Sequence, residues 1–127
     1  MQSSRVVLLV DDDPDIRDSV GECLRDEGYE VHTAGNGQEA LDRLSDGLRP
    51  SVILLDLMMP VLNGFEVLQA LRDRHDWRGI PVVIVSANRG YEAEDMRGVF
   101  DILRKPVPLE RMLETIERAL ATAALPA

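Results

Sequence analysis

The chain has 127 residues, of which 45% are hydrophobic, 4% aromatic and 29% charged, and its formal net charge is −9 at pH 7. This length and composition predict one domain with an aliphatic core and exclude a disordered chain. The acidic balance argues against direct nucleic-acid binding and against docking to an anionic membrane, and it favours a cation or a basic surface as partner.

Cys23 is the only cysteine, so no internal disulfide can form, which fits a reducing compartment. Its helical spacing with Val20 and Leu24 predicts that Cys23 lies in the core. The apolar stretches are shorter than the about 20 residues that a membrane-spanning helix needs. Residues 1–5 lead into the first apolar run without a signal-peptide cleavage site. We therefore expect a soluble cytoplasmic protein.

The first apolar run, VVLLV at residues 6–10, predicts a fully buried strand and ends abruptly in Asp11, Asp12 and Asp13. Asp13 is a typical N-cap, and Pro14 is typical of the first residue of a helix. The three aspartates therefore divide into a strand-end pair and a helix cap.

The rest of the chain repeats this alternation of apolar runs and helical spacing. The first helix is expected to end at Gly28. Further strands are expected at residues 29–34, 51–55, 81–85 and 99–103. Further helices are expected at 36–47, from Asn63 onward, weakly at 89–97, and from Pro108 onward, with 121–127 as a frayed tail.

Five strands that alternate with helices predict an α/β fold with one parallel sheet covered by helices on both faces. In such sheets the binding site lies outside the carboxyl ends of the strands. This rule brings Asp11, Asp12, Asp56, Ser86 and Lys105 to one edge, because each lies at or just after the end of an expected strand.

These residue types together indicate phosphoryl chemistry. Two carboxylates a few ångström apart repel each other by about 1 to 4 kcal/mol, and a hard cation such as Mg²⁺ (or Mn²⁺) would neutralise them while leaving room for phosphate oxygens. Asp56 is the expected nucleophile, since a carboxylate can accept a phosphoryl group as an acyl phosphate. The Ser86 hydroxyl and the Lys105 ammonium would stabilise the charge on the transferring group.

Five short motifs resemble the receiver domain of bacterial two-component response regulators, in particular the single-domain, chemotaxis-type receivers. They are VDDDPDIR at 10–17, LLDLMMP at 54–60, NGFEVL at 63–68, VSA at 85–87 and KP at 105–106. The resemblance covers about residues 5–120 of a single receiver domain that would span 1–127. It implies a flavodoxin-like, doubly wound fold of five βα units with strand order 2-1-3-4-5.

The resemblance also implies a role for each site residue. Asp56 would be the phospho-acceptor, Asp12 a direct metal ligand, Asp11 a ligand acting mainly through water, and the backbone carbonyl of Met58 a further ligand. Ser86 would be the switch hydroxyl, Ala87 would leave room for the phosphoryl group, and Lys105 would be the family's lysine, joined to Pro106 by a cis bond.

Two features depart from the family pattern. Ile102 stands where an aromatic switch residue is common, and Phe100, two residues earlier, is expected to share its strand face. The segment between Ser86 and Lys105 is about three residues shorter than usual, and its expected helix has little apolar periodicity. We therefore expect an altered output face.

The resemblance implies a sensor histidine kinase or a histidine phosphotransfer protein as phosphoryl donor and an unidentified downstream protein as partner. No DNA-binding domain follows within the sequence, so we expect output by protein contact, unless the sequence is a piece of a longer protein.

Two alternatives remain at this point. A receiver fold used as a non-phosphorylated scaffold is favoured by the weak helix at 89–97 and disfavoured by the complete acidic site. A hydrolase of the haloacid dehalogenase type needs a second aspartate two residues after the nucleophile, where this chain has Met58. We therefore expect no enzyme activity beyond phosphorylation and dephosphorylation of the chain itself.

Overall fold

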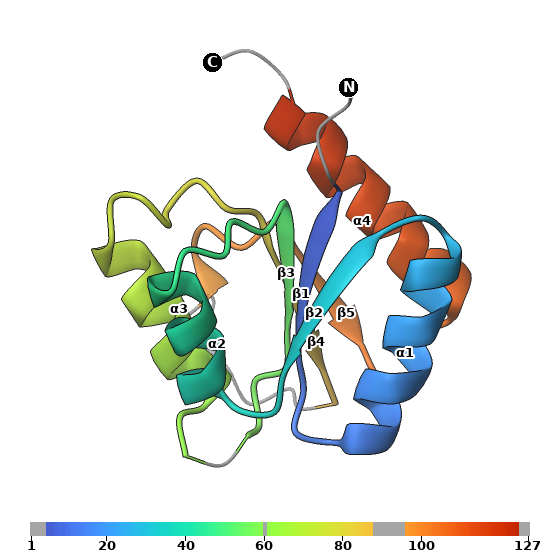
Figure 1. Cartoon of the computed structure of the whole chain (residues 1–127), viewed down its shortest axis with the longest axis horizontal. Helices are drawn as coiled ribbons and strands as arrows, with labels where there is room; N and C mark the ends of the chain where they lie inside the picture. Colours follow the sequence, from blue (N-terminus) through green and yellow to red (C-terminus); the bar gives the residue numbers. More distant parts are fainter. Residues whose placement is uncertain (1–4, 60, 88–95, 125–127) are drawn as a thin grey trace.

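The structure is a computed structural model of the chain, and it describes residues 5–59, 61–87 and 96–124 (Figure 1). Its strands are β1 (Val6–Val10), β2 (Glu30–Ala34), β3 (Val52–Leu55), β4 (Val82–Ser86) and β5 (Asp101–Arg104). Its helices are α1 (Pro14–Asp26), α2 (Gly37–Ser45), α3 (Gly64–Asp73) and α4 (Leu109–Ala124). All strand pairs are parallel and the order is β2-β1-β3-β4-β5, which confirms the predicted topology.

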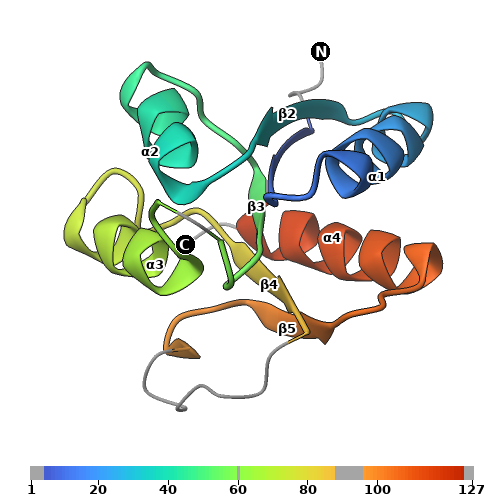
Figure 2. The same ribbon diagram turned by 90° about the horizontal axis from the view of Figure 1, so that it is seen from below.

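Two hydrophobic clusters lie on opposite faces of the sheet. Leu8 and Val10 of β1 belong to the cluster that also contains residues of α2 and α3. Val7 and Leu9 belong to the other cluster, together with residues of α1 and α4. Figure 2 shows these helix pairs on the two sides of the sheet. Because β1 is covered on both faces, all five of its residues are buried, as the continuous apolar run predicts.

Side-chain caps fix the start of three helices shortly after the strand ends. The Asp13 carboxylate accepts a hydrogen bond from the backbone N–H of Asp15 at 2.9 Å, which confirms Asp13 as the cap of α1. Asn36 caps α2, and Asn63 forms a reciprocal capping box with Glu66 at the start of α3. Asp13 and Asn63 thereby set where the loops that carry Asp11 and Asp56 end.

Three expectations about the fold need correction or stay open. Helix α4 continues to Ala124, so residues 121–124 are helical and the frayed tail does not begin at 121. Cys23 is partly exposed and lies outside both buried clusters, because it sits at the edge of the buried stripe of α1, beside Leu24. Most of the weak helix expected at 89–97 lies outside the described residues.

Phe100 and Ile102 lie against opposite faces of the sheet, so the expectation that they share one face is wrong. Ile102 pairs with Ile84 and packs against the cluster of α2 and α3, whereas Phe100 packs against the cluster of α1 and α4. The two-residue periodicity holds only inside a strand, and β5 begins at Asp101, after Phe100.

Within the described part of the chain, each helix is too short or too polar to cross a membrane.

Candidate functional site

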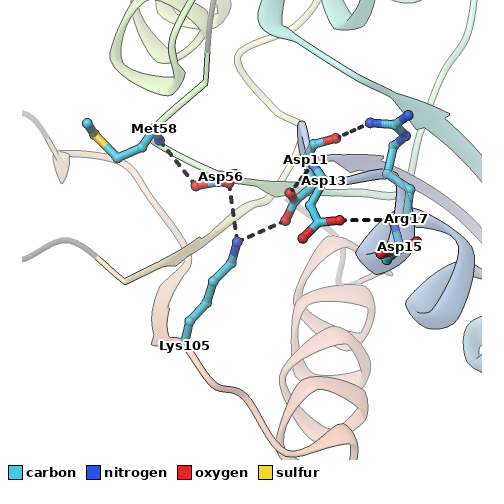
Figure 3. A network of polar contacts seen from close by, with 7 residues as sticks. All are labelled: Asp11, Asp13, Asp15, Arg17, Asp56, Met58 and Lys105. Atoms are coloured by element: carbon cyan, nitrogen blue, oxygen red, sulfur yellow. Dashed lines mark hydrogen bonds and ion pairs between the residues drawn. The ribbon is translucent and has the colours of Figure 1, made fainter.

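Three charged side chains from distant segments meet at the carboxyl edge of the sheet (Figure 3). Asp11 follows β1, Asp56 follows β3 and Lys105 follows β5. The Lys105 ammonium lies 3.0 Å from Oδ2 of Asp11 and 3.2 Å from Oδ2 of Asp56. Both carboxylates are buried. The structure therefore brings together the residues that strand-end position alone had assigned to one edge.

The backbone holds the other oxygen of each buried carboxylate. Oδ1 of Asp11 accepts from the N–H of Asp13 at 2.9 Å, and Oδ1 of Asp56 accepts from the N–H of Met58 at 3.1 Å. Each carboxylate is thus fixed by its own loop on one side and faces the lysine on the other. The backbone of the loops after β1 and β3 thus preorganises one oxygen of each carboxylate.

Sequence reasoning missed Arg17, which supports the first of these loops. From α1, its guanidinium donates to the backbone carbonyl of Asp11 at 2.7 Å. Figure 3 shows this guanidinium on the side of Asp11 away from Lys105. Its position four residues after the N-cap Asp13 was the available signal, since a side chain there lies one turn from the loop.

The carboxylates of Asp11, Asp12 and Asp56 can hold one small cation. They each offer an oxygen, and these atoms all lie within 4.8 Å of one another. Asp12 is exposed, while Asp11 and Asp56 are buried. An all-oxygen donor set that is open on one side suits Mg²⁺, which retains several waters or phosphate oxygens among its ligands. The donor set therefore fits the ion, and the ligand role of the Met58 carbonyl stays a prediction.

Burial and charge shift two pKa values at this site. Burial raises the pKa of Asp56 above its usual 3.8, and the charge of Asp11 adds to this, although the Met58 N–H and Lys105 oppose it. Burial alone would lower the pKa of Lys105, but the hydrogen bond with Asp11 and the charges of Asp56 and Asp11 outweigh burial and hold it above 10.5. Lys105 is therefore a fixed cation at neutral pH, and the Asp56 carboxylate is destabilised relative to water.

The remaining predicted residues surround this centre. Ser86 ends β4 and is 2% exposed, whereas Ala87 is exposed and lines a cavity of about 430 Å³ together with Asp11, Asp56 and Lys105. This cavity extends between α1 and α4 over apolar side chains of the sheet. The Lys105–Pro106 bond is cis, as the resemblance implied. Ile102 is partly buried in β5, one strand beyond Ile84.

Fold and site together define a doubly wound α/β domain with an acidic, lysine-bridged centre at the carboxyl edge of its sheet. The family model of the response regulator receiver domain matches residues 7–117. The chain belongs to this family, in which phosphorylation and magnesium are typical and which serves two-component signalling.

Solved structures agree with this assignment. The chemotaxis response regulator CheY4 of Vibrio cholerae superposes with a TM-score of 0.83 at 36% identity, covering 93% of this chain and all of that one (100%). The response regulator TrrA of Thermotoga maritima, solved in complex with Mg²⁺-BeF, superposes with a TM-score of 0.81 at 29% identity, covering 91% of this chain and 99% of that one.

Curated relatives are longer proteins. The nitrogen assimilation regulatory protein NtrX of Azorhizobium caulinodans is 36% identical over 124 residues, which are 94% of this chain and 27% of NtrX. The response regulator MprA of Mycolicibacterium vanbaalenii is 38% identical over 118 residues, which are 90% of this chain and 49% of MprA. The chain thus spans about a quarter of one relative and about half of the other.

Proposed function

We propose that this receiver domain is a switch that accepts a phosphoryl group on Asp56. The donor would be a phosphohistidine of a sensor histidine kinase or a histidine phosphotransfer protein. The observation that carries this proposal is the Lys105 ammonium held within 3.2 Å of both Asp11 and Asp56, beside an exposed Ala87 and an open cavity. A structural ion pair needs only one carboxylate for one lysine, so the second buried carboxylate beside Lys105 supports a chemical role for this site.

Asp11, Asp12 and Asp56 would hold Mg²⁺ or Mn²⁺, which supplies charge neutralisation for the transferring oxygens when bound. The TrrA structure with Mg²⁺-BeF supports this choice by similarity. Met58 is 58% exposed, and Figure 3 shows its side chain directed away from Asp56.

The chain's own residues would carry the transfer as follows. The Met58 N–H fixes one oxygen of Asp56, so the other oxygen is aimed toward Lys105 and the cavity. That oxygen attacks phosphorus, the P–N bond to histidine breaks, and its electron pair stays on the histidine nitrogen. Lys105, already tied to Asp11, is positioned to pair with a phosphoryl oxygen in the transition state.

Signalling would follow from the charge added at Asp56. Ser86, next to the exposed Ala87, would donate its hydroxyl to the phosphoryl group, and Ile102 on the neighbouring strand would repack. To change a two-state ratio from 1:99 to 99:1, the phosphoryl group must favour the active state by about 5.5 kcal/mol. Charge-assisted hydrogen bonds from Ser86 and Lys105 would supply part of this. A downstream protein partner would read the change.

The test is intact-mass measurement after incubation with Mg²⁺ and acetyl phosphate. We expect the wild type to gain the mass of one phosphoryl group and Asp56→Asn to gain none. Asp13→Asn is the matched control, because it removes a neighbouring carboxylate and asparagine caps a helix as well as aspartate does. No gain in the wild type would favour a non-phosphorylated scaffold, and a gain in Asp56→Asn would exclude Asp56 as acceptor.

A further inference from the structure

A second cavity lies at the opposite edge of the sheet from Asp56. It has a volume of about 210 Å³ and is lined by Arg72 of α3, by Trp77 and Arg78 of the loop that follows, and by Arg97 ahead of β5. We call it the arginine pocket. Its floor is apolar and comes from α3 and the start of β4. Figures 1 and 2 show the end of α3 beside the segment that leads into β5, on the side away from α1.

Trp77, which lines this pocket, carries an unsatisfied hydrogen-bond donor. The side chain is buried, with 4% of the residue exposed. Its indole N–H is fully buried and has no acceptor among the residues that the structure describes. A buried polar group without a partner costs about 1–3 kcal/mol, so such a group in a native protein calls for an explanation. An acceptor atom supplied by a bound molecule would be one.

The positive charge at the pocket is concentrated and only partly compensated. Arg74 stacks on the Trp77 ring at 4.2 Å and pairs with Asp76, and Arg72 donates to the carbonyl of Arg97 at 2.7 Å. Arg78 and Arg97 are exposed, and neither forms an ion pair with a described residue. This is an unusual neighbourhood in a chain of net charge −9.

We propose that the arginine pocket binds a small oxyanion, a carboxylate or phosphate, attached to a compact apolar body. The oxyanion would pair with Arg78 and Arg97, and the Trp77 indole would shift to donate its buried N–H to an oxygen. The apolar part would cover the floor formed by α3 and β4. A volume of about 210 Å³ equals that of about seven waters, which suits a ligand of about ten non-hydrogen atoms.

This site is independent of phosphoryl transfer to Asp56. Trp77 and Val82 lie at the amino end of β4, whereas Ser86 at its carboxyl end adjoins the acidic site. A variant of the arginine pocket therefore keeps the acidic site intact. Phosphorylation of Asp56, measured by mass, separates failure of one proposal from failure of the other.

The experiment uses Trp77, the only tryptophan of the chain, as the reporter. Phenyl phosphate is titrated while the fluorescence of Trp77 and the NMR resonance of its indole N–H are followed. Benzylamine, with a similar ring and the opposite charge, is the control ligand. Arg78→Gln/Arg97→Gln removes two pocket charges. Arg43→Gln/Arg111→Gln removes the same charge at exposed arginines outside the pocket. Circular dichroism verifies that both variants fold.

We expect phenyl phosphate to shift the indole resonance saturably, with a dissociation constant on the order of 1 mM for a ligand of this size. Binding should weaken about tenfold or more in Arg78→Gln/Arg97→Gln and stay within about twofold in the control variant. Benzylamine should give no saturable shift. The proposal is overturned if phenyl phosphate moves neither signal, if benzylamine binds equally well, or if the two double variants behave alike.

Discussion

At the scale of single residues, the acidic site is a balance between one amine and two buried carboxylates. Oδ1 of Asp11 and Oδ1 of Asp56 accept from backbone N–H groups, and Oδ2 of each faces Lys105. Asp11 and Asp56 are also two of the three carboxylates that could hold a cation, so Lys105 and a bound cation would share these two groups. Occupancy by a metal and the position of the Lys105 amine are therefore coupled.

The titration of Lys105 measures this balance directly, because Lys105 is the only lysine in the chain. After reductive methylation with ¹³C, NMR should show one side-chain amine with a pKa above 10.5. The only other signal comes from the N-terminal amine, a group whose ordinary pKa is about 7.7–8.0. Asp56→Asn should lower the pKa of Lys105, because it removes a charge and a hydrogen bond that raise it.

Asp13→Asn is the control for this titration, because Asp13 is not among the groups that shift the pKa of Lys105. An unchanged Lys105 pKa in Asp56→Asn would mean that the amine does not face Asp56 in solution.

Asp56→Asn should also stabilise the fold at neutral pH in the presence of EDTA. In the folded protein the pKa of Asp56 is raised above 3.8, the ordinary value that applies to the unfolded chain. Ionisation of Asp56 therefore lowers the free energy of unfolding as the pH rises from 3.8 through the raised pKa. Asparagine cannot ionise, so it avoids this penalty. We expect the free energy of unfolding at pH 7, measured by urea denaturation, to be higher for Asp56→Asn than for the wild type.

The same measurement near pH 3 provides the internal check. There Asp56 is largely protonated in both states, so the difference between wild type and Asp56→Asn should shrink toward zero. A variant that is less stable than the wild type at pH 7 would show that attraction to Lys105 outweighs burial and repulsion from Asp11.

At the scale of elements, the start of α3 supports the loop that carries Asp56. The N–H of Gly64 donates to the carbonyl of Leu57 at 3.0 Å. A Cβ at Gly64 would lie 2.6 Å from the carbonyl oxygen of Asp56 and 2.6 Å from Cα of Leu57. Both neighbours are backbone atoms, so they cannot move aside without displacing the loop.

Gly64→Ala should therefore destabilise the fold by about 1–3 kcal/mol and slow phosphorylation of Asp56. Thermal unfolding and the mass assay measure the two effects. Gly79→Ala is the matched control, because no atom lies within 4 Å of its Cβ position and its backbone is not in the left-handed region. Gly79→Ala should be neutral or slightly stabilising. Equal effects of the two substitutions would contradict close packing at Gly64.

Some of these helices and strands can be predicted from the sequence alone. Helix starts can be predicted from the capping residues Asp13, Asn36 and Asn63, because a cap acts on backbone groups only two or three residues away. Strand ends at Asp11 and Asp56 were equally readable from buried apolar runs. The sheet face that Phe100 contacts could not be predicted in this way, because it depends on where β5 begins to pair with β4, and that pairing is a tertiary contact.

At the scale of the whole molecule, the parallel sheet separates two kinds of charge. The carboxyl edge gathers the buried carboxylates and Lys105, and the amino edge near Trp77 gathers arginines. The sequence predicts the acidic group at the carboxyl edge, because binding sites of parallel sheets lie outside the carboxyl ends of the strands. No comparable rule collects Arg72, Arg78 and Arg97, since they come from a helix end, a loop and a segment ahead of β5, and only the packed structure shows their common cavity.

Cation binding should stabilise the whole domain in a pH-dependent way. Mg²⁺ at about ten times its dissociation constant adds about 1.4 kcal/mol to the free energy of unfolding, or about 2–6 °C in melting temperature. A proton on Asp56 competes with the cation, and the pKa of Asp56 is raised. The Mg²⁺-induced shift should therefore grow as the pH rises from about 4 through that raised pKa and then level off.

Differential scanning fluorimetry at several pH values, with NaCl at matched ionic strength as the salt control, measures this shift. Asp12→Asn should reduce it strongly, because Asp12 contributes one of the three carboxylates within 4.8 Å of each other. Asp13→Asn, which removes the same charge one residue away, should retain it. A shift that is equal in the two variants, or that shrinks as the pH rises, would mean that Mg²⁺ acts by general screening of the net charge of −9 and not at the acidic site.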